Sequence, residues 1–300
     1  MDVLARRKAL RRCKDLPFVL GSNFVGVIHR CGPAAEDLGF TLGERVASVV
    51  KWGSNSKYVS IPASKLTLVP KSLDSAEIAT MLAIYLPAFQ ALHHGRSRPH
   101  RYSEDCLRGR SIFVTGGAKL EVQALLKLAL FGGADKIFVT APEEHNQVLK
   151  RIKNVTVLSE NPKEWLPLVK ENMHLVVDFL FPKHFVKIKQ TLKRKGRLVC
   201  IAPRKANADS PCMFNWDSFY ERSRVSMMKR ATMYDFAESF ALCPDEMKQD
   251  LEFLLKLLTT RQVRPSIEKI ITLDDVPAAH ADLQTRPLRG AIVCEPWKES

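Results

Sequence analysis

Two adjacent glycines, Gly116 and Gly117, stand between an apolar run and a helical pattern in the middle of the chain. Residues 111–115 are apolar enough for a buried strand, and 120–131 carry apolar residues at helical spacing. A strand, a glycine turn and a helix hold phosphate groups, because the free N–H groups and the dipole at a helix N-terminus attract anions. The glycines do not complete the G-x-G-x-x-G pattern, so this prediction depends on the order of the elements. It covers Thr115, Gly116, Gly117, Ala118 and Lys119.

The cysteines and histidines do not form a metal-binding pattern. The seven cysteines are scattered and include no C-x-x-C pair, which argues against a disulfide framework and against a thiolate zinc site. His93 and His94 are neighbours, but adjacent side chains on a helix point in different directions, and no third ligand is evident. We therefore expect no metal. No G-x-S-x-G serine motif is present, and nucleophilic catalysis has little support.

The glycine turn lies within an alternation of strands and helices. From 111 to 201, runs typical of strands alternate with helical patterns, which predicts right-handed crossovers and a parallel sheet. The strands are expected at 111–115, 136–140, 155–158, 175–179 and 197–201, and the helices at 120–131, 143–152 and 184–192.

Shorter elements flank this alternation. Turn formers from 18 to 69 separate three expected strands and indicate a small, mainly antiparallel β domain, with strands at 24–28, 45–50 and 57–61. Asp74 and Glu77 have the spacing of a capping box at the start of a helix. The remaining expected elements are helices at 87–94, 246–258 and 274–283, and strands at 267–273 and 290–294.

Length and charge limit the class of protein. A chain of 300 residues favours two domains, and the net charge of +14 attracts polyanions. Because no aromatic-interleaved RNA motif accompanies the charge, we interpret it as a solvated basic surface, with nucleic-acid binding as the less favoured alternative. The apolar run 122–134 is interrupted by Lys127 and two glycines, so no membrane span is expected. The scattered cysteines favour the cytoplasm, and the Arg-rich start leaves a mitochondrial leader as the alternative.

Several short motifs then follow one another in the order of one known family. Residues 16–27 (LPFVLGSNFVGV), 42–46 (LGERV) and 69–77 (VPKSLDSAE) resemble its entry segment, its xGDRV turn and its VPxxLdxxEAA segment. Further similar segments are 85–92, 276–280 and 289–293. The chain thus resembles the quinone oxidoreductase-like, zinc-free branch of the medium-chain dehydrogenase/reductase superfamily.

This resemblance implies an α/β fold made of a GroES-like β domain and a Rossmann doubly wound parallel-sheet domain. The implied boundaries are 1–88 with 262–300 for the GroES-like substrate domain, and 89–261 for the nucleotide-binding domain. Residues 1–7 resemble a helix that family members carry well inside their chains, so the β domain is expected to be incomplete at its N-terminus. The implied cofactor is NADPH or NADH, without zinc.

The resemblance also implies roles for single residues. Cofactor contacts fall on Thr115, Gly116, Gly117, Ala118, Lys119, Thr140, Glu143, Ile201 and Arg289. Asn23 stands where the family has an acidic or polar residue beside the cleft, with a turn former as the alternative. Tyr85 would stack near the nicotinamide or protonate a product, with a buried packing tyrosine as the favoured alternative. Residues 21–23 (GSN) replace the Gly-His-Glu of zinc alcohol dehydrogenases, which implies no catalytic zinc.

The phosphate loop departs from the family pattern. The family's AAGGVG aligns on 117–122, where Lys119, Leu120 and Val122 replace glycines. A side chain at these places blocks close backbone approach or pushes the helix off the sheet, although Lys119 adds a cation as a partial compensation.

The segment after the second strand departs as well. Glu143 and Glu144 occupy the stretch that reads the 2′-phosphate of NADPH in the family. Carboxylates repel a 2′-phosphate but accept hydrogen bonds from a free ribose 2′-OH, as acidic residues do in NAD sites.

Two functions follow from this sequence. The first is a zinc-independent NAD(P)H-dependent oxidoreductase that transfers hydride to a small quinone, enone or carbonyl substrate, with a homodimer as an open alternative for its assembly. The second is a pseudoenzyme that has lost cofactor binding and serves as a scaffold for a protein or a nucleic acid, because fold does not determine function. The altered phosphate loop and the basic surface favour the second.

Overall fold

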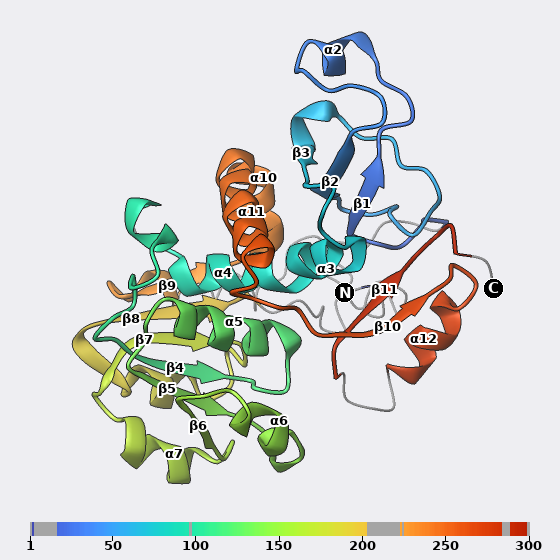
Figure 1. Ribbon diagram of the computed structural model, residues 1–300. Coiled ribbons are helices and arrows are strands. Elements are labelled where there is room, and N and C mark those ends of the chain that lie inside the picture. Colours follow the sequence, from blue (N-terminus) through green and yellow to red (C-terminus); the bar gives the residue numbers. More distant parts are fainter. Residues whose placement is uncertain are drawn as a thin grey trace. The chain divides into compact units, whose positions relative to one another are not determined.

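The computed structural model describes residues 2, 17–95, 98–202, 223, 225–283 and 289–298 (Figure 1). The chain divides into two compact units, Met1–Leu86 with Arg204–Asp209 and Phe240–Ser300, and Pro87–Pro203 with Ser210–Ser239. The basic segment 6–14, and all of the segment 1–7 except Asp2, lie outside the described residues.

The second unit is built on a six-stranded parallel sheet. In chain order its strands are β4 (Ser111–Thr115), β5 (Lys136–Thr140), β6 (Val155–Leu158), β7 (Met173–Asp178), β8 (Leu192–Ile201) and β9 (Ala231–Tyr234). They lie in the order β6-β5-β4-β7-β8-β9, and each neighbouring pair is parallel. This is the order of a doubly wound nucleotide-binding sheet, which reverses between β4 and β7. The predicted Rossmann sheet is confirmed, with β9 as a strand that the sequence did not indicate.

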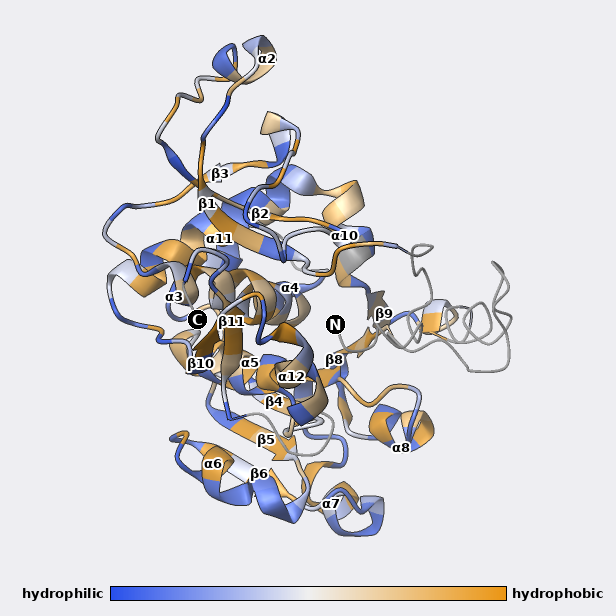
Figure 2. Ribbon diagram, turned by 90° about the vertical axis from the view of Figure 1, so that its right-hand side faces the viewer, coloured by the Kyte–Doolittle hydropathy of each residue, from blue (hydrophilic) through white to orange (hydrophobic). Residues whose placement is uncertain are grey.

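Helices connect these strands and bury the sheet. They are α5 (Leu120–Phe131), α6 (Asn146–Lys150), α7 (Pro162–Val169) and α8 (Phe185–Lys189). All five residues of β4 are buried, as expected for a central strand covered on both faces, and Figure 2 shows the hydrophobic character of β4 and β5. Phe113 of β4 packs against Trp165 of α7, with ring centroids 5.2 Å apart.

The first unit contains two small sheets. The antiparallel sheet consists of β1 (Asn23–Val27), β2 (Arg45–Val49) and β3 (Thr67–Leu68), with Asn23 opposite Val49. The other pairs β10 (Ile267–Ile271) with β11 (Ala291–Cys294) in parallel, and α12 (Val276–Asp282) connects them. The expected strand at 57–61 was wrong, because this segment is irregular and the third strand is β3 instead. Tyr58 contacts the rings of His29 and Trp297 there, with centroids 5.6 and 5.4 Å apart.

One continuous helix replaces the two expected between 74 and 94. It runs through α3 (Ser75–Thr80), the π-helical turn η2 (Met81–Tyr85) and α4 (Leu86–His93). Pro87 is accommodated directly after the wider turn, in which the Leu86 N–H donates to the Met81 carbonyl. By length and composition, Ser75–His93 is apolar enough to cross a membrane, contrary to our expectation, but 72% of its most apolar window is buried within the protein, as in a core helix.

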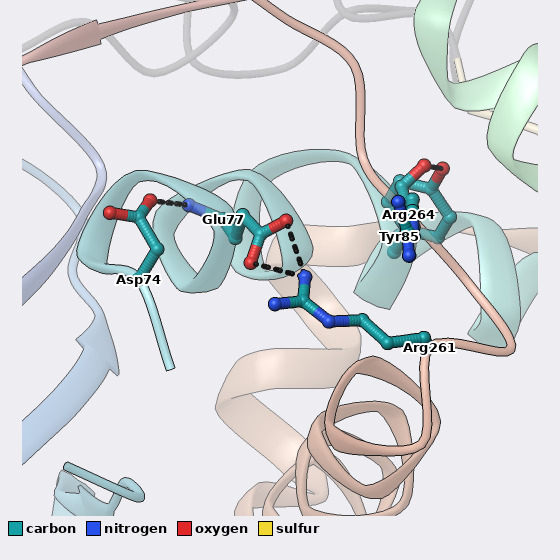
Figure 3. A network of polar contacts seen from close by, with 5 residues as sticks. All are labelled: Asp74, Glu77, Tyr85, Arg261 and Arg264. Carbon is teal, nitrogen blue, oxygen red and sulfur yellow. Dashed lines mark hydrogen bonds and ion pairs between the residues drawn. The ribbon is translucent and has the colours of Figure 1, made fainter. Parts of the chain in front are cut away.

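Polar contacts hold this helix to the C-terminal part of the first unit (Figure 3). The Asp74 carboxylate caps the helix by accepting from the Glu77 N–H at 2.9 Å, as predicted. Glu77 does not complete the capping box in the contacts observed, because its carboxylate lies 3.3 Å from the guanidinium of Arg261. Arg261 follows α11 (Pro244–Thr259), which contacts η2. These contacts explain why residues from Phe240 onward belong to the first unit, whereas the sequence placed 89–261 together.

Candidate functional site

The predicted phosphate turn lies at the carboxyl edge of the parallel sheet. Three of the predicted cofactor-binding residues lie at this edge, because each is the last residue of a strand. They are Thr115 of β4, Thr140 of β5 and Ile201 of β8. Ligands of doubly wound sheets bind outside this edge, at the point where the strand order reverses. That point lies between β4 and β7, beside Gly116.

Both glycines are required by their surroundings. Gly116 has a φ of +83°, and a Cβ there would lie 3.3 Å from Phe179 Cβ. The Gly117 N–H donates to the Thr140 carbonyl at 2.8 Å, which holds the turn against the end of β5. A Cβ on Gly117 would lie 2.8 Å from Leu149 Cδ1 and 2.9 Å from Ala141 Cβ. The turn therefore has the close packing that a glycine loop needs, although it lacks the full motif.

The residues that replace the family's glycines take different positions. Val122 is fully buried and packs in the core of the unit, and Leu120 is half-buried at the start of α5. Lys119 is exposed, and its ammonium donates to the Phe179 carbonyl at 2.6 Å. The first N–H groups of α5 have no partners within the helix, which is general for helix N-termini. An anion at this turn would meet those N–H groups and the charge of Lys119.

The last residue of β7, Asp178, is one that the site prediction left out. Asp178 is fully buried opposite Thr115 in the register of β4 and β7, and Thr115 Oγ1 donates to Asp178 Oδ1 at 2.6 Å. The Leu180 N–H donates to the same Oδ1 at 3.1 Å, while Oδ2 is buried without a partner among the described residues. Burial raises the pKa of Asp178 to about 6, against the opposing effects of these hydrogen bonds and of Lys119. The sequence signal that could have identified Asp178 as a site residue is its position directly after the apolar run 175–177.

Two carboxylates follow β5. Glu143 and Glu144 begin the short helix η4 (Glu143–His145), and both are exposed. His145 is buried, and its Nδ1 lies 3.9 Å from Glu144 Oε1. Any ligand group that reaches beyond Thr140 meets negative charge here.

The remaining predicted residues belong to the first unit. Asn23 begins β1, and the Arg289 N–H donates to Glu268 Oε2 at 2.9 Å. Tyr85 is buried in η2, and its hydroxyl donates to the Arg264 carbonyl at 3.1 Å, as Figure 3 shows. Burial raises the pKa of the Tyr85 hydroxyl well above its usual value. These contacts show Tyr85 in a packing position, and catalytic roles for Asn23 and Tyr85 stay predictions.

Replacing Tyr85 with Phe separates packing from catalysis. Tyr85→Phe removes one buried hydrogen bond and leaves the Arg264 carbonyl without that donor, so we expect a loss of about 1 kcal/mol in the free energy of unfolding. If the hydroxyl only packs, kcat for nicotinamide oxidation stays within about twofold. A fall of a hundredfold in kcat, with stability changed as expected, would instead assign Tyr85 to proton transfer.

Among the residues described, no group of three or more His, Cys, Asp and Glu side chains is arranged to hold a metal ion. His93 and His94 contact different rings, those of Phe89 at 4.6 Å and Tyr234 at 5.3 Å.

A glycine turn at the switch point of this strand order, with a small β unit in the same chain, is typical of nucleotide-binding dehydrogenases. Residues 156–294 match the family model of zinc-binding dehydrogenases. The chain is 25% identical to the Drosophila melanogaster protein "NAD(P)H oxidoreductase RTN4IP1, mitochondrial" over 95% of this chain and 71% of that protein. It is 23% identical to a trans-enoyl reductase of Pyrenochaetopsis sp over 43% of this chain, and spans only 38% of that relative.

Solved structures share the fold. A mycobacterial quinone oxidoreductase superposes with a TM-score of 0.74 at 22% identity, over 94% of this chain and 84% of that one. The human synaptic vesicle membrane protein VAT-1 homolog-like protein gives 0.74 at 17% identity, over 100% and 86%. At these identities the solved structures show a shared fold, and the family model and the curated relatives confirm the predicted resemblance to the medium-chain dehydrogenase/reductase superfamily.

Proposed function

We propose that this protein is a zinc-independent, nicotinamide-dependent oxidoreductase that passes hydride to a small quinone, enone or carbonyl substrate. The observation that carries the proposal is the glycine turn at the N-terminus of α5, beside the point where the strand order reverses. The names of the matched proteins, an NAD(P)H oxidoreductase and a quinone oxidoreductase, support it.

The residues at the carboxyl edge would hold the cofactor's diphosphate. The first N–H groups of α5 and the ammonium of Lys119 would face the phosphates, because both carry positive charge toward the same turn. When bound, the nicotinamide supplies the hydride, and the protein's part is to position it and exclude water. Zinc independence is proposed from residues 21–23 (GSN), which replace the Gly-His-Glu of zinc alcohol dehydrogenases.

The carboxylates of Glu143 and Glu144 favour NADH over NADPH. Both are exposed directly after β5, where the second strand of such sheets meets the adenosine ribose. A 2′-phosphate would be repelled by them, whereas a free 2′-OH donates a hydrogen bond to a carboxylate.

Nucleotide binding with a lysine variant tests this proposal. We expect NADH to raise the melting temperature and to bind more tightly than NADPH, and Lys119→Gln to weaken NADH binding about tenfold by removing a charge-assisted contact. Lys136→Gln, which removes an exposed lysine at the opposite end of β5, is the control and should change the Kd less than twofold.

The scaffold function is the second candidate, and one observation favours it. The Leu180 Cδ2 atom lies 3.4 Å from the position that a Cβ on Gly116 would take, so an apolar side chain lies beside the turn. Absence of any stabilisation by millimolar NADH or NADPH would reject the oxidoreductase and leave the scaffold. Oxidation of NADH in the presence of a quinone would reject the scaffold.

A further inference from the structure

A basic hollow lies at the amino edge of the parallel sheet, the edge opposite the glycine turn. It is open to solvent, has a volume of about 590 Å³ and is lined by Lys170, Glu171, Lys189, Gln190, Leu192, Arg194 and Arg230. Four lining residues are cations and one is a carboxylate. Lys170 and Glu171 precede β7, Lys189 and Gln190 precede β8, and Arg230 precedes β9. Because these strands are parallel, the hollow is separated from the carboxyl edge by the length of β7, about 17 Å at roughly 3.3 Å per residue.

Positive charge predominates in the part of the chain that forms this hollow. Residues 170–202 contain eight Lys and Arg against two carboxylates, and one of these, Asp178, is buried at the far edge. Lys193, Arg194 and Lys195 are consecutive, and Arg194 and Lys195 are exposed. Gathering like charges is unfavourable unless an anion compensates them.

An irregularity of β8 carries these three cations. Met173 of β7 pairs with Leu192 of β8, but Leu175 pairs with Arg197, so the four residues 193–196 of β8 lie opposite His174 alone. Gly196 is required at this bulge, since a Cβ there would lie 2.5 Å from the Met173 carbonyl oxygen. The bulge thus presents the cations in a defined place.

Hydrogen bonds make the walls of the hollow rigid. The Arg230 guanidinium donates to the carbonyls of Lys193 and Arg194 at 2.7 and 2.6 Å, which ties the start of β9 to the bulge and fixes the plane of the guanidinium. The Glu171 N–H donates to the Gln190 carbonyl at 2.8 Å, which ties the segment before β7 to the segment before β8. The Arg230 guanidinium and the backbone that carries the other cations are therefore held in place before any ligand arrives, which lowers the entropic cost of binding.

We propose that this basic hollow binds a compact ligand that carries two or more phosphate groups, free in solution or on a lipid headgroup. Its volume is that of a small-molecule site, and Arg and Lys are the residues that recognise phosphate. None of the seven lining residues is aromatic, so the hollow has no surface on which a nucleobase would stack. A concave cluster also suits a compact polyanion better than the extended backbone of a nucleic acid.

Binding of inorganic tripolyphosphate to matched charge variants tests the proposal. The first variant combines Lys170→Gln, Lys189→Gln and Arg194→Gln, and the control combines Lys136→Gln, Lys150→Gln and Arg151→Gln, six exposed residues of the same unit. Both lose three positive charges. Measured by calorimetry with saturating NADH present, the affinity should fall at least tenfold in the first variant and less than twofold in the control. Equal losses in both, or no binding by the unaltered protein, would overturn the proposal.

Further arms distinguish the sources of the phosphates and check folding. The protein is sedimented with phosphatidylcholine vesicles that contain a polyphosphoinositide and with vesicles that lack it. A lipid headgroup is identified if the unaltered protein binds only the vesicles with the polyphosphoinositide and the first variant binds neither. The protein is also tested with a short DNA duplex. If the duplex binds and tripolyphosphate does not compete with it, the proposal is overturned in favour of a nucleic acid. Arg194→Lys keeps the charge, so it should keep the affinity within about threefold, and a loss as large as that of the triple variant would mean that the bulge has been disrupted.

Discussion

Gly117→Val is expected to lower the free energy of unfolding of the second unit by about 3 kcal/mol and to abolish NADH binding. A Cβ at this position would lie 2.8 Å from Leu149 Cδ1, 2.9 Å from Ala141 Cβ and 3.1 Å from the Thr140 carbonyl oxygen. Overpacking a buried site costs up to about 3 kcal/mol, and here the backbone of β5 would have to move as well. The turn would then lose the hydrogen bond from the Gly117 N–H to Thr140 that holds it at the sheet edge.

Gly32→Val is the matched control for this substitution. Gly32 has a negative φ of −95°, and a Cβ there would have no neighbour within 4 Å among the described residues. We expect a change below about 1 kcal/mol and unchanged NADH binding. Calorimetric unfolding with and without NADH measures both effects. An equally stable Gly117→Val protein that still binds NADH would show that the cofactor does not use this turn.

Asp178→Asn is expected to change the dependence of stability on pH. Burial raises the pKa of Asp178 in the folded state to about 6, whereas an unfolded aspartate has a pKa of about 3.9. The folded state therefore holds this proton more tightly, so the group's stabilising contribution is present below about pH 4 and is lost as the pH rises through about 6. A difference of about two pKa units corresponds to about 3 kcal/mol. Asparagine does not ionise, so the unfolding free energy of the variant minus that of the unaltered protein should rise by about 3 kcal/mol from about pH 4 to about pH 7.

Asp275→Asn provides a contrast of opposite sign. The exposed carboxylate of Asp275 accepts from the Thr272 N–H at 3.1 Å and from Thr272 Oγ1 at 3.0 Å, and these bonds lower its pKa. The stabilising contribution of Asp275 is therefore lost as the pH falls. The unfolding free energy of Asp275→Asn minus that of the unaltered protein should consequently fall as the pH rises. Denaturant unfolding at several pH values measures both variants. If the difference between Asp178→Asn and the unaltered protein stays flat from about pH 4 to about pH 7, the folded state does not raise the pKa of Asp178 above that of an unfolded aspartate.

The strands of the parallel sheet could be predicted because their sequences are simple. The segments 111–115, 136–140 and 155–158 were expected with the bounds that β4, β5 and β6 have. A strand between two layers of helices is a continuous apolar run, so its length is visible without any partner. The third strand of the first unit was missed because β3 has only two residues, too few to show alternation.

The continuity of the helix through Pro87 was missed for a different reason. Proline normally ends or interrupts a helix, and the sequence contains no sign of the π-helical turn at Met81–Tyr85 that directly precedes it.

The sequence by itself determined the order of the elements, the resemblance to one superfamily, and the position of the glycine turn. Each of these depends on residues close together in the chain, such as Gly116 and Gly117 between a strand and a helix. Only the tertiary structure decided that Thr115 meets Asp178, which is 63 residues away, and that Arg230 joins Lys170 at one hollow. Parallel pairing places strand ends together regardless of their separation in the chain, so contacts across an edge of the sheet depend on register rather than on local pattern.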